Sequence, residues 1–214
     1  MYEIIRNKPI DIGAVLDDAK PKGVIHCGAN IAEELYLYEE RGIDNVCWIE
    51  ADPRTYEKLQ SVLSNRKEDV IINAAVSDHN GMSDFYVMDN DGASSSLLMP
   101  TGHLVKYPTI KHTEKIKVLA RTLDSLIFEG SIAIKNHDFL YMDLQGSEYF
   151  ALKGFENNIK HIKYILSEIN YEEIYQGCVL VDEFDEYLSG LGFIKQWATI
   201  HETVGWGDAY YKRV

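Results

Sequence analysis

Short apolar runs alternate with amphipathic stretches along most of this chain of 214 residues, and this order constrains its fold more than any other feature. A short apolar run is typical of a buried strand, and apolar residues repeated at i, i+4 and i+7 are typical of a helix. Strands and helices in strict alternation predict βαβ units. The sequence therefore predicts an α/β fold with a mainly parallel sheet and helices on both faces.

Five apolar runs are predicted to form the parallel strands. Gly42 and Gly192 are predicted to end two of the helices, and Pro53 is predicted to lie in the first turn of another. The predicted strands are 23–27, 46–49, 70–76, 139–142 and 164–169, and the predicted helices begin near Ile31, Pro53, Thr122, Gly146 and Val181.

The remaining segments are predicted to extend this core. The turn signal Asn80-Gly81 before an alternating run at 84–88 predicts an inserted hairpin, and 116–119 predicts a further short strand. Residues 193–199 and 208–212 predict a closing antiparallel pair. Residues 89–115 lack periodicity, as in a long loop or lid. With 1–21 as an N-terminal lead-in, residues 1–214 are expected to form a single domain.

The charge of the chain limits its partners. A net charge of −13 repels phosphate backbones and anionic lipid surfaces, so neither nucleic acid nor membrane is an expected partner. Three widely spaced cysteines favour reduced thiols and a cytoplasmic location. The sequence has no apolar run long enough to cross a bilayer and no leader-like N-terminus.

Small and acidic residues follow the first two predicted strands. Ligands of open α/β sheets bind beyond the carboxyl ends of the strands. Gly28 lets a ligand approach the backbone, and Glu50, about 20 residues later, is placed to accept ribose hydroxyls. Together they favour an adenosine-containing ligand, and the alternatives are an ordinary tight turn and a solvated carboxylate. Their neighbours Ala29, Asn30 and Ala51 are included in the predicted cofactor site.

The later strand ends carry the other candidates. Ser77 and Asp78 are predicted to border an adenine, or else to form only a turn. Asp143 faces the expected reacting end of the ligand, where a carboxylate favours a cation. Glu168 is the candidate general base if the acceptor is a hydroxyl and burial raises its pKa. The alternative is a structural role for each.

The loop 89–115 and the histidines add weaker candidates. Ser95 and Ser96 are predicted to bind substrate, although a flexible linker has the same composition. His103 and His112 are candidate bases, with solvated loop histidines as the alternative. His26 lies within a strand and is interpreted as a core residue. No metal-binding motif is present, so no metal is predicted.

Taken together, these segments resemble the FkbM family of S-adenosylmethionine-dependent methyltransferases over about residues 22–195. The most specific part is the RTLDSL element at 121–126 followed by DLQGSE at 143–148. The sequence differs from the usual family pattern at His26, where aspartate is common, and at Ala32, where glycine is common. The other matching segments are 24–42, 46–60, 72–87, 94–97 and 165–170.

The resemblance implies a Rossmann-like class I methyltransferase: a mainly parallel seven-stranded sheet whose last strand is antiparallel. It implies O-methylation of a sugar, glycan or small metabolite, with S-adenosylmethionine as cofactor. We predict that Asp143, Glu168 and His112 are catalytic. Predicted cofactor contacts are Gly28, Ala29, Asn30, Glu50, Ala51, Ser77, Asp78, Asp143 and Gln145, and predicted substrate contacts are Ser95, Ser96, Glu148 and Asn170.

Two other functions fit parts of the pattern. A nicotinamide-dependent oxidoreductase also uses a glycine turn and a ribose-binding acid, but the third glycine and a matching catalytic set are missing from this sequence. A non-catalytic relative that binds a cofactor or a partner is the second alternative, because His26 and Ala32 depart from the family pattern. The sequence leaves the acceptor's identity and the choice between monomer and homodimer open.

Overall fold

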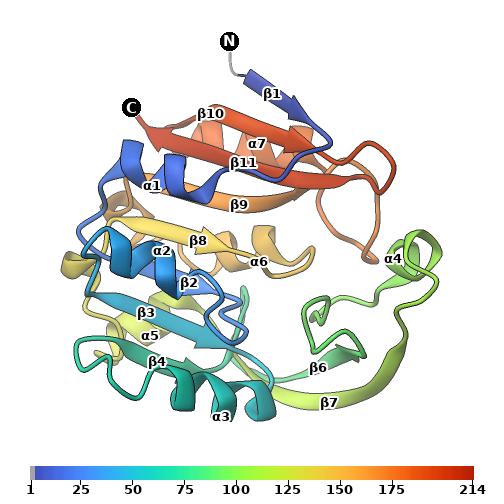
Figure 1. Cartoon of the computed structure of the whole chain (residues 1–214), viewed down its shortest axis with the longest axis horizontal. Helices are drawn as coiled ribbons and strands as arrows, with labels where there is room; N and C mark the ends of the chain where they lie inside the picture. The colour runs from blue at the N-terminus through green and yellow to red at the C-terminus, as the bar shows by residue number, and fades with distance from the viewer. Residues whose placement is uncertain (1–2) are drawn as a thin grey trace.

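The computed structural model describes residues 3–214, and its main sheet carries eight strands within that range (Figure 1). Seven of them confirm the predicted class I arrangement, with β11 antiparallel to both of its neighbours. The eighth, β1, extends the edge beside β10 and comes from the predicted lead-in, whose first two residues lie outside the described range. The order is β1 (Glu3–Arg6), β10 (Phe193–Ile200), β11 (Trp206–Arg213), β9 (Tyr164–Asn170), β8 (Phe139–Met142), β2 (Val24–Cys27), β3 (Val46–Glu50) and β4 (Val70–Asn73).

A second, three-stranded sheet corrects the prediction of an inserted hairpin. Here β7 (His112–Arg121) lies between β5 (Ala75–Val76) and β6 (Gly81–Met88). The strand predicted at 70–76 is therefore two strands: β4 stays in the main sheet and β5 joins the second one. The Asn80-Gly81 turn does not pair β5 with β6, because both use β7 as their partner.

Two predicted boundaries also move. α2 (Leu35–Glu40) begins four residues after Ile31, since Asn30 and Ala32 have left-handed φ angles of 43° and 59° that no α-helix accommodates. The predicted loop 89–115 contains α4 (Thr101–Lys106), and its last residues already belong to β7.

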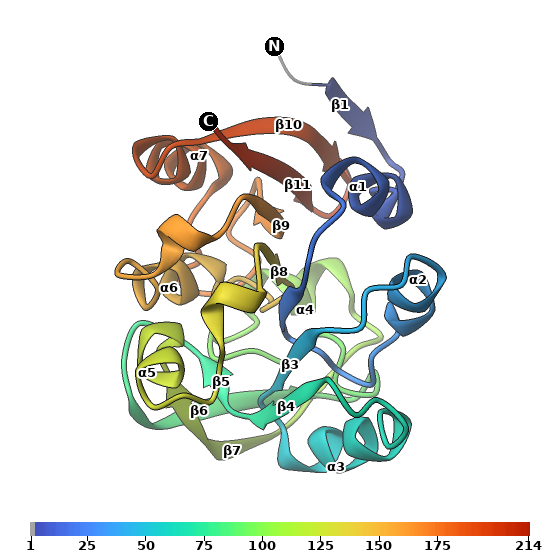
Figure 2. The same cartoon turned by 90° about the vertical axis from the view of Figure 1, so that its left-hand side faces the viewer.

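Helices cover both faces of the main sheet, as predicted (Figure 2). On one face Leu16, Tyr38 and Leu59 pack against Trp48, and on the other Leu152 and Phe184 belong to a second apolar cluster. Burying each such side chain stabilises the fold by about 1.5–3 kcal/mol. The first face carries α1 (Ile12–Ala19), α2 and α3 (Pro53–Val62), and the second carries α5 (Leu123–Phe128), α6 (Glu148–Lys153) and α7 (Val181–Gly190).

Side-chain caps fix the starts of two helices at the predicted places. Asp52 accepts a hydrogen bond from Arg54 N ahead of Pro53, and Thr122 accepts one from Ser125 N at the start of α5. Within residues 3–214, no helix combines the length and the apolar character that crossing a bilayer requires.

Candidate functional site

A crevice lies at the carboxyl ends of β2, β3 and β8. Its empty space, including the open mouth, is about 840 Å³. Its walls carry most of the predicted cofactor contacts and also the loop that follows β6. Residues lining it include Gly28, Ala29, Asn30, Glu34, Glu50, Ala51, Ala74, Phe85, Ser95, Asp143 and Gln145.

Gly28 allows two of these strand ends to meet. Its φ is +83°, and a Cβ at this position would lie 1.9 Å from the carbonyl oxygen of Asp143. No side chain fits there without moving the backbone. Because Gly28 has no Cβ, Asp143 N can also donate to Cys27 O at 3.0 Å. The glycine thus holds the ends of β2 and β8 together at the floor of the crevice.

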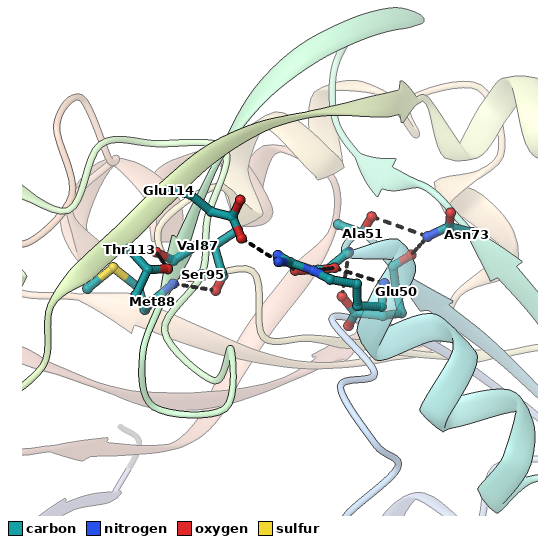
Figure 3. Close-up of polar contacts among 10 residues, drawn as sticks. Glu50, Ala51, Asn73, Val87, Met88, Ser95, Thr113 and Glu114 are labelled. Atoms are coloured by element: carbon teal, nitrogen blue, oxygen red, sulfur yellow. Dashed lines mark hydrogen bonds and ion pairs between the residues drawn. The ribbon is translucent and has the colours of Figure 1, made fainter.

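Glu50 forms the acidic wall at the end of β3. Its two carboxylate oxygens accept from Asn30 N at 2.9 Å and from Asp52 N at 2.8 Å. Burial raises its pKa to about 7. Figure 3 shows Asn73 beside it, with the amide donating to Glu50 O at 2.9 Å and to Ala51 O at 3.2 Å. The carboxylate is thus fixed in position, and each oxygen keeps acceptor capacity toward the crevice.

Gln145 joins two acidic groups at the deep end of the crevice. Its amide nitrogen donates to Asp143 Oδ1 at 2.6 Å and to Glu168 Oε2 at 2.9 Å. Its amide oxygen accepts from the buried Tyr175 hydroxyl at 2.7 Å. Gln145 itself has a φ of 55°, and backbone strain of this kind collects at ligand sites. The side chain is therefore held from three directions between Asp143 and Glu168.

The acids in this region have raised pKa values because they are buried together. Burial raises the pKa of Glu168 well above its usual range, and Asp143 adds a like charge. Burial also raises the pKa of Asp143, and that of Glu34 to about 7. Perturbed carboxyl groups in a crevice are a physical mark of a functional site. The described residues contain no group of three or more acidic, histidine or cysteine side chains arranged to hold a metal ion.

The crevice also has an apolar wall. Ala74, Ala75, Val76, Phe85 and Leu97 supply it. Ser77 and Asp78, predicted to border an adenine, line a neighbouring hollow instead. There the Asp78 carboxylate pairs with His79 at 2.8 Å.

The predicted substrate contacts divide into two kinds. Ser95 lines the crevice and accepts from Met88 N at 3.1 Å (Figure 3). Ser96 is buried and donates to Gln145 O at 2.8 Å, and Glu148 accepts from Leu144 N at 2.7 Å. These two side chains hold loops in place. Asn170 is buried at the end of β9.

His112 is not brought to the crevice. It is exposed at the start of β7 and lies 5.6 Å from the Tyr86 ring, centroid to centroid. His26 lines the crevice yet behaves as the expected core residue: its Nδ1 lies 3.1 Å from the Tyr38 hydroxyl, and burial lowers its pKa to about 3.

The sequence analysis missed Asp208. This residue lies on β11 directly opposite Glu168 on β9, and burial and Asp143 raise its pKa to about 7. An acid among the small and aromatic residues of 206–211 was the available signal. The hydrogen bond from Tyr175 to Gln145 was not foreseen either.

Comparisons with known proteins agree with this geometry, which is that of a Rossmann-like fold. Two solved structures share the fold. The NADB-Rossmann superfamily protein from Streptococcus agalactiae aligns with a TM-score of 0.52 and 12% identity, over 96% of this chain and 69% of that one. M. capricolum TrmK in complex with S-adenosyl-homocysteine aligns with a TM-score of 0.51 and 8% identity, over 89% and 62%.

The Methyltransferase FkbM domain matches residues 26–195, and the chain belongs to this family. The predicted resemblance is thereby confirmed. The chain is also similar to 2-O-methyltransferase NoeI of Sinorhizobium fredii, at 28% identity over 134 residues. That match covers 60% of this chain and 54% of NoeI, so the chain spans about half the length of this curated relative.

Proposed function

We propose that this chain is an S-adenosylmethionine-dependent O-methyltransferase that acts on a hydroxyl of a sugar, glycan or small metabolite. The observation that carries the proposal is the Glu168–Gln145–Asp143 arrangement. It places a buried carboxyl group beside a crevice whose other end has an acid suited to a ribose. Family membership and the similarity to NoeI, which is named as a 2-O-methyltransferase, support the same reaction.

The chemistry of the crevice lining suits the cofactor. Glu50 offers acceptor capacity to a ribose diol, and the apolar wall with Ala75 and Phe85 offers a surface for an adenine. Glu34 and Asp143 supply negative charge for an ammonium group at the far end. When bound there, S-adenosylmethionine supplies an electrophilic methyl group on a sulfonium. Acidic walls favour such a cation electrostatically.

The chain's own chemical task is to orient the acceptor hydroxyl and to take its proton. Glu168 is placed for this, since Gln145 holds Oε2 and leaves Oε1 without a hydrogen-bond partner among the described residues. A raised pKa makes its carboxylate a stronger base than a solvated glutamate. The Tyr175–Gln145 hydrogen bond keeps the Gln145 amide group pointing its nitrogen at both acids.

We further propose that residues 1–214 act as one domain and that the acceptor is not a nucleic acid. The support is the net charge of −13 and the acidic lining of the site. A phosphate backbone approaching this surface meets repulsion in place of the basic contacts that nucleic-acid binding uses.

Calorimetry with S-adenosylhomocysteine tests the cofactor part of this proposal. We expect binding that Glu50→Ala weakens at least tenfold, because hydrogen bonds to a charged group contribute about 1.5–3 kcal/mol. Glu186→Gln on the exposed side of α7 is the charge-matched control and should bind normally. Absence of binding at millimolar concentration refutes the proposal.

Deuterated-methyl transfer from S-adenosylmethionine to a set of hydroxylated acceptors tests the chemistry by mass spectrometry. Glu168→Gln should bind S-adenosylhomocysteine as the parent chain does and lose about 10²–10⁴-fold in kcat. Unchanged turnover in this variant removes Glu168 as the base.

A further inference from the structure

A second pocket lies next to the crevice and shares Asp143 and Gln145 with it. It is bounded by the ends of β8, β9 and β11, by α4, and by Pro9, Ile10 and Ile12 around the start of α1. The two pockets meet at the Gln145 amide that holds Glu168. A molecule in the second pocket therefore lies beside the candidate base.

The charged side chains of the second pocket are all acidic. Asp143, Glu168 and Asp208 line it, and no lysine or arginine does so among the described residues. Glu168 and Asp208 are direct cross-strand neighbours. In their ionised forms these groups repel an anionic ligand, and salt screens charges in a partly buried site only weakly. The repulsion therefore grows as the pH rises through the Asp208 pKa of about 7.

Two buried polar atoms in the wall of the second pocket have no hydrogen-bond partner among the described residues. Glu168 is 6% exposed and His103 is 3% exposed. Glu168 Oε1 and His103 Nδ1 make no hydrogen bond within residues 3–214. A buried polar atom without a partner costs free energy, about 1–3 kcal/mol each, which a ligand recovers by hydrogen bonding. Both atoms belong to side chains that line the pocket.

Donors on a ligand suit both atoms in their accepting forms. The ionised Glu168 Oε1 accepts hydrogen bonds only, and His103 Nδ1 accepts one in the tautomer that carries its proton on Nε2. Burial lowers the pKa of His103, so the ring favours its neutral form. Hydroxyl and ammonium groups are donors of this kind, whereas phosphate and carboxylate groups are not.

Aromatic rings complete the wall. Trp206 lies on β11 and donates from Nε1 to the Tyr107 hydroxyl at 2.8 Å, which joins the end of α4 to the closing strands. The His103 and Tyr107 rings are 4.8 Å apart, centroid to centroid. Amphipathic rings next to polar groups suit a ligand with an apolar face and a hydroxylated edge.

We propose that the second pocket is the acceptor site and that the acceptor is an uncharged or amine-bearing hydroxylated ring, to the exclusion of phosphorylated and carboxylated ones. This inference rests on the proposed function, because it assigns the acceptor to the same reaction. It adds the charge class of the acceptor. Asp208 acts in it as a specificity-determining residue through its charge.

The test uses the full chain saturated with S-adenosylhomocysteine, whose binding is measured first by calorimetry. The indole N–H signal of Trp206 is then followed by NMR, and its assignment among three tryptophans comes from Trp206→Phe. The probes are methyl β-D-glucopyranoside, methyl α-L-fucopyranoside, glucosamine and glucose 6-phosphate. We expect the neutral and aminated sugars to shift the signal, with glucose 6-phosphate at least tenfold weaker than its neutral counterpart.

Asp208→Asn should reduce the difference in binding strength between glucose 6-phosphate and methyl β-D-glucopyranoside. Glu186→Gln should leave this difference unchanged. No shift with any neutral or aminated probe, or a stronger response to glucose 6-phosphate, overturns the inference even when S-adenosylhomocysteine binds. Failure of S-adenosylhomocysteine to bind is the separate result that refutes the proposed function.

Discussion

Gly28→Ala should damage this protein more than an alanine at another glycine with the same backbone angle. Gly28 has a φ of +83° and Gly130 a φ of +85°, so both substitutions force alanine into the left-handed region. Only the first places the new Cβ against backbone, 1.9 Å from Asp143 O. Around Gly130 no atom of the described residues, apart from the glycine and its two chain neighbours, lies within 4 Å of the Cβ position. The pair therefore separates backbone strain from the collision.

The expected magnitudes follow from these contacts. Left-handed backbone costs an L-residue about 1–2 kcal/mol, and this is the whole expected effect of Gly130→Ala. In Gly28→Ala the ends of β2 and β8 must also separate, which lengthens the 3.0 Å hydrogen bond from Asp143 N to Cys27 O. Losing that bond adds about 1 kcal/mol, and strain in the displaced loop raises the total to roughly 3–4 kcal/mol.

Urea unfolding of the two variants measures the difference, and calorimetry with S-adenosylhomocysteine reports on the site. Gly28→Ala should lose at least 1 kcal/mol more than Gly130→Ala and should weaken binding, because Asp143 and Gln145 move with the strand end. Gly130→Ala should bind as the parent chain does. Equal unfolding free energies and equal affinities for the two variants would refute the assignment of Gly28 as the contact that joins β2 to β8.

Three further predictions concern the walls of the site. Glu50→Gln should gain stability relative to the parent chain as the pH rises from 5 to 8, as measured by thermal unfolding. The pKa of Glu50 is about 7 in the folded chain, above its unfolded value. Protonated Glu50 therefore stabilises the parent chain fully at low pH, and this stabilisation is lost as the pH rises through the folded pKa. A flat difference contradicts this. Tyr175→Phe removes the hydrogen bond that orients the Gln145 amide group. This variant should lower kcat about tenfold and leave the affinity for S-adenosylhomocysteine unchanged. An unchanged kcat would contradict the positioning role of Tyr175. Ser96→Ala removes the hydrogen bond to Gln145 O, so backbone amides near it should exchange hydrogen faster by mass spectrometry, and unaltered exchange would show that this bond does not secure the loop.

The strands and the strand-end acids were predictable because local patterns determine them. Val46–Glu50 is fully buried, so its apolar run alone indicates a central parallel strand, and Glu50 follows at the edge where such sheets bind ligands. The second sheet was not predictable in the same way. β7 runs from His112 to Arg121 and most of it is exposed, so its sequence predicted a strand only at 116–119. Its pairing with both β5 and β6 depends on contacts between segments that are separated in the sequence, which local patterns do not determine.

The polar residues of the site show where sequence reasoning stops. Ser96 and Glu148 lie in the motifs that suggested substrate contacts, yet the backbone already satisfies both side chains. Glu168 and His103 were both named as candidate bases, and each retains a buried atom without a partner among the described residues. A buried polar atom remains in a stable fold when something else compensates its cost, and a ligand is one such compensation. For these four side chains the structure, and not the sequence, shows which have their hydrogen-bond partners and which keep an unpartnered atom beside the second pocket.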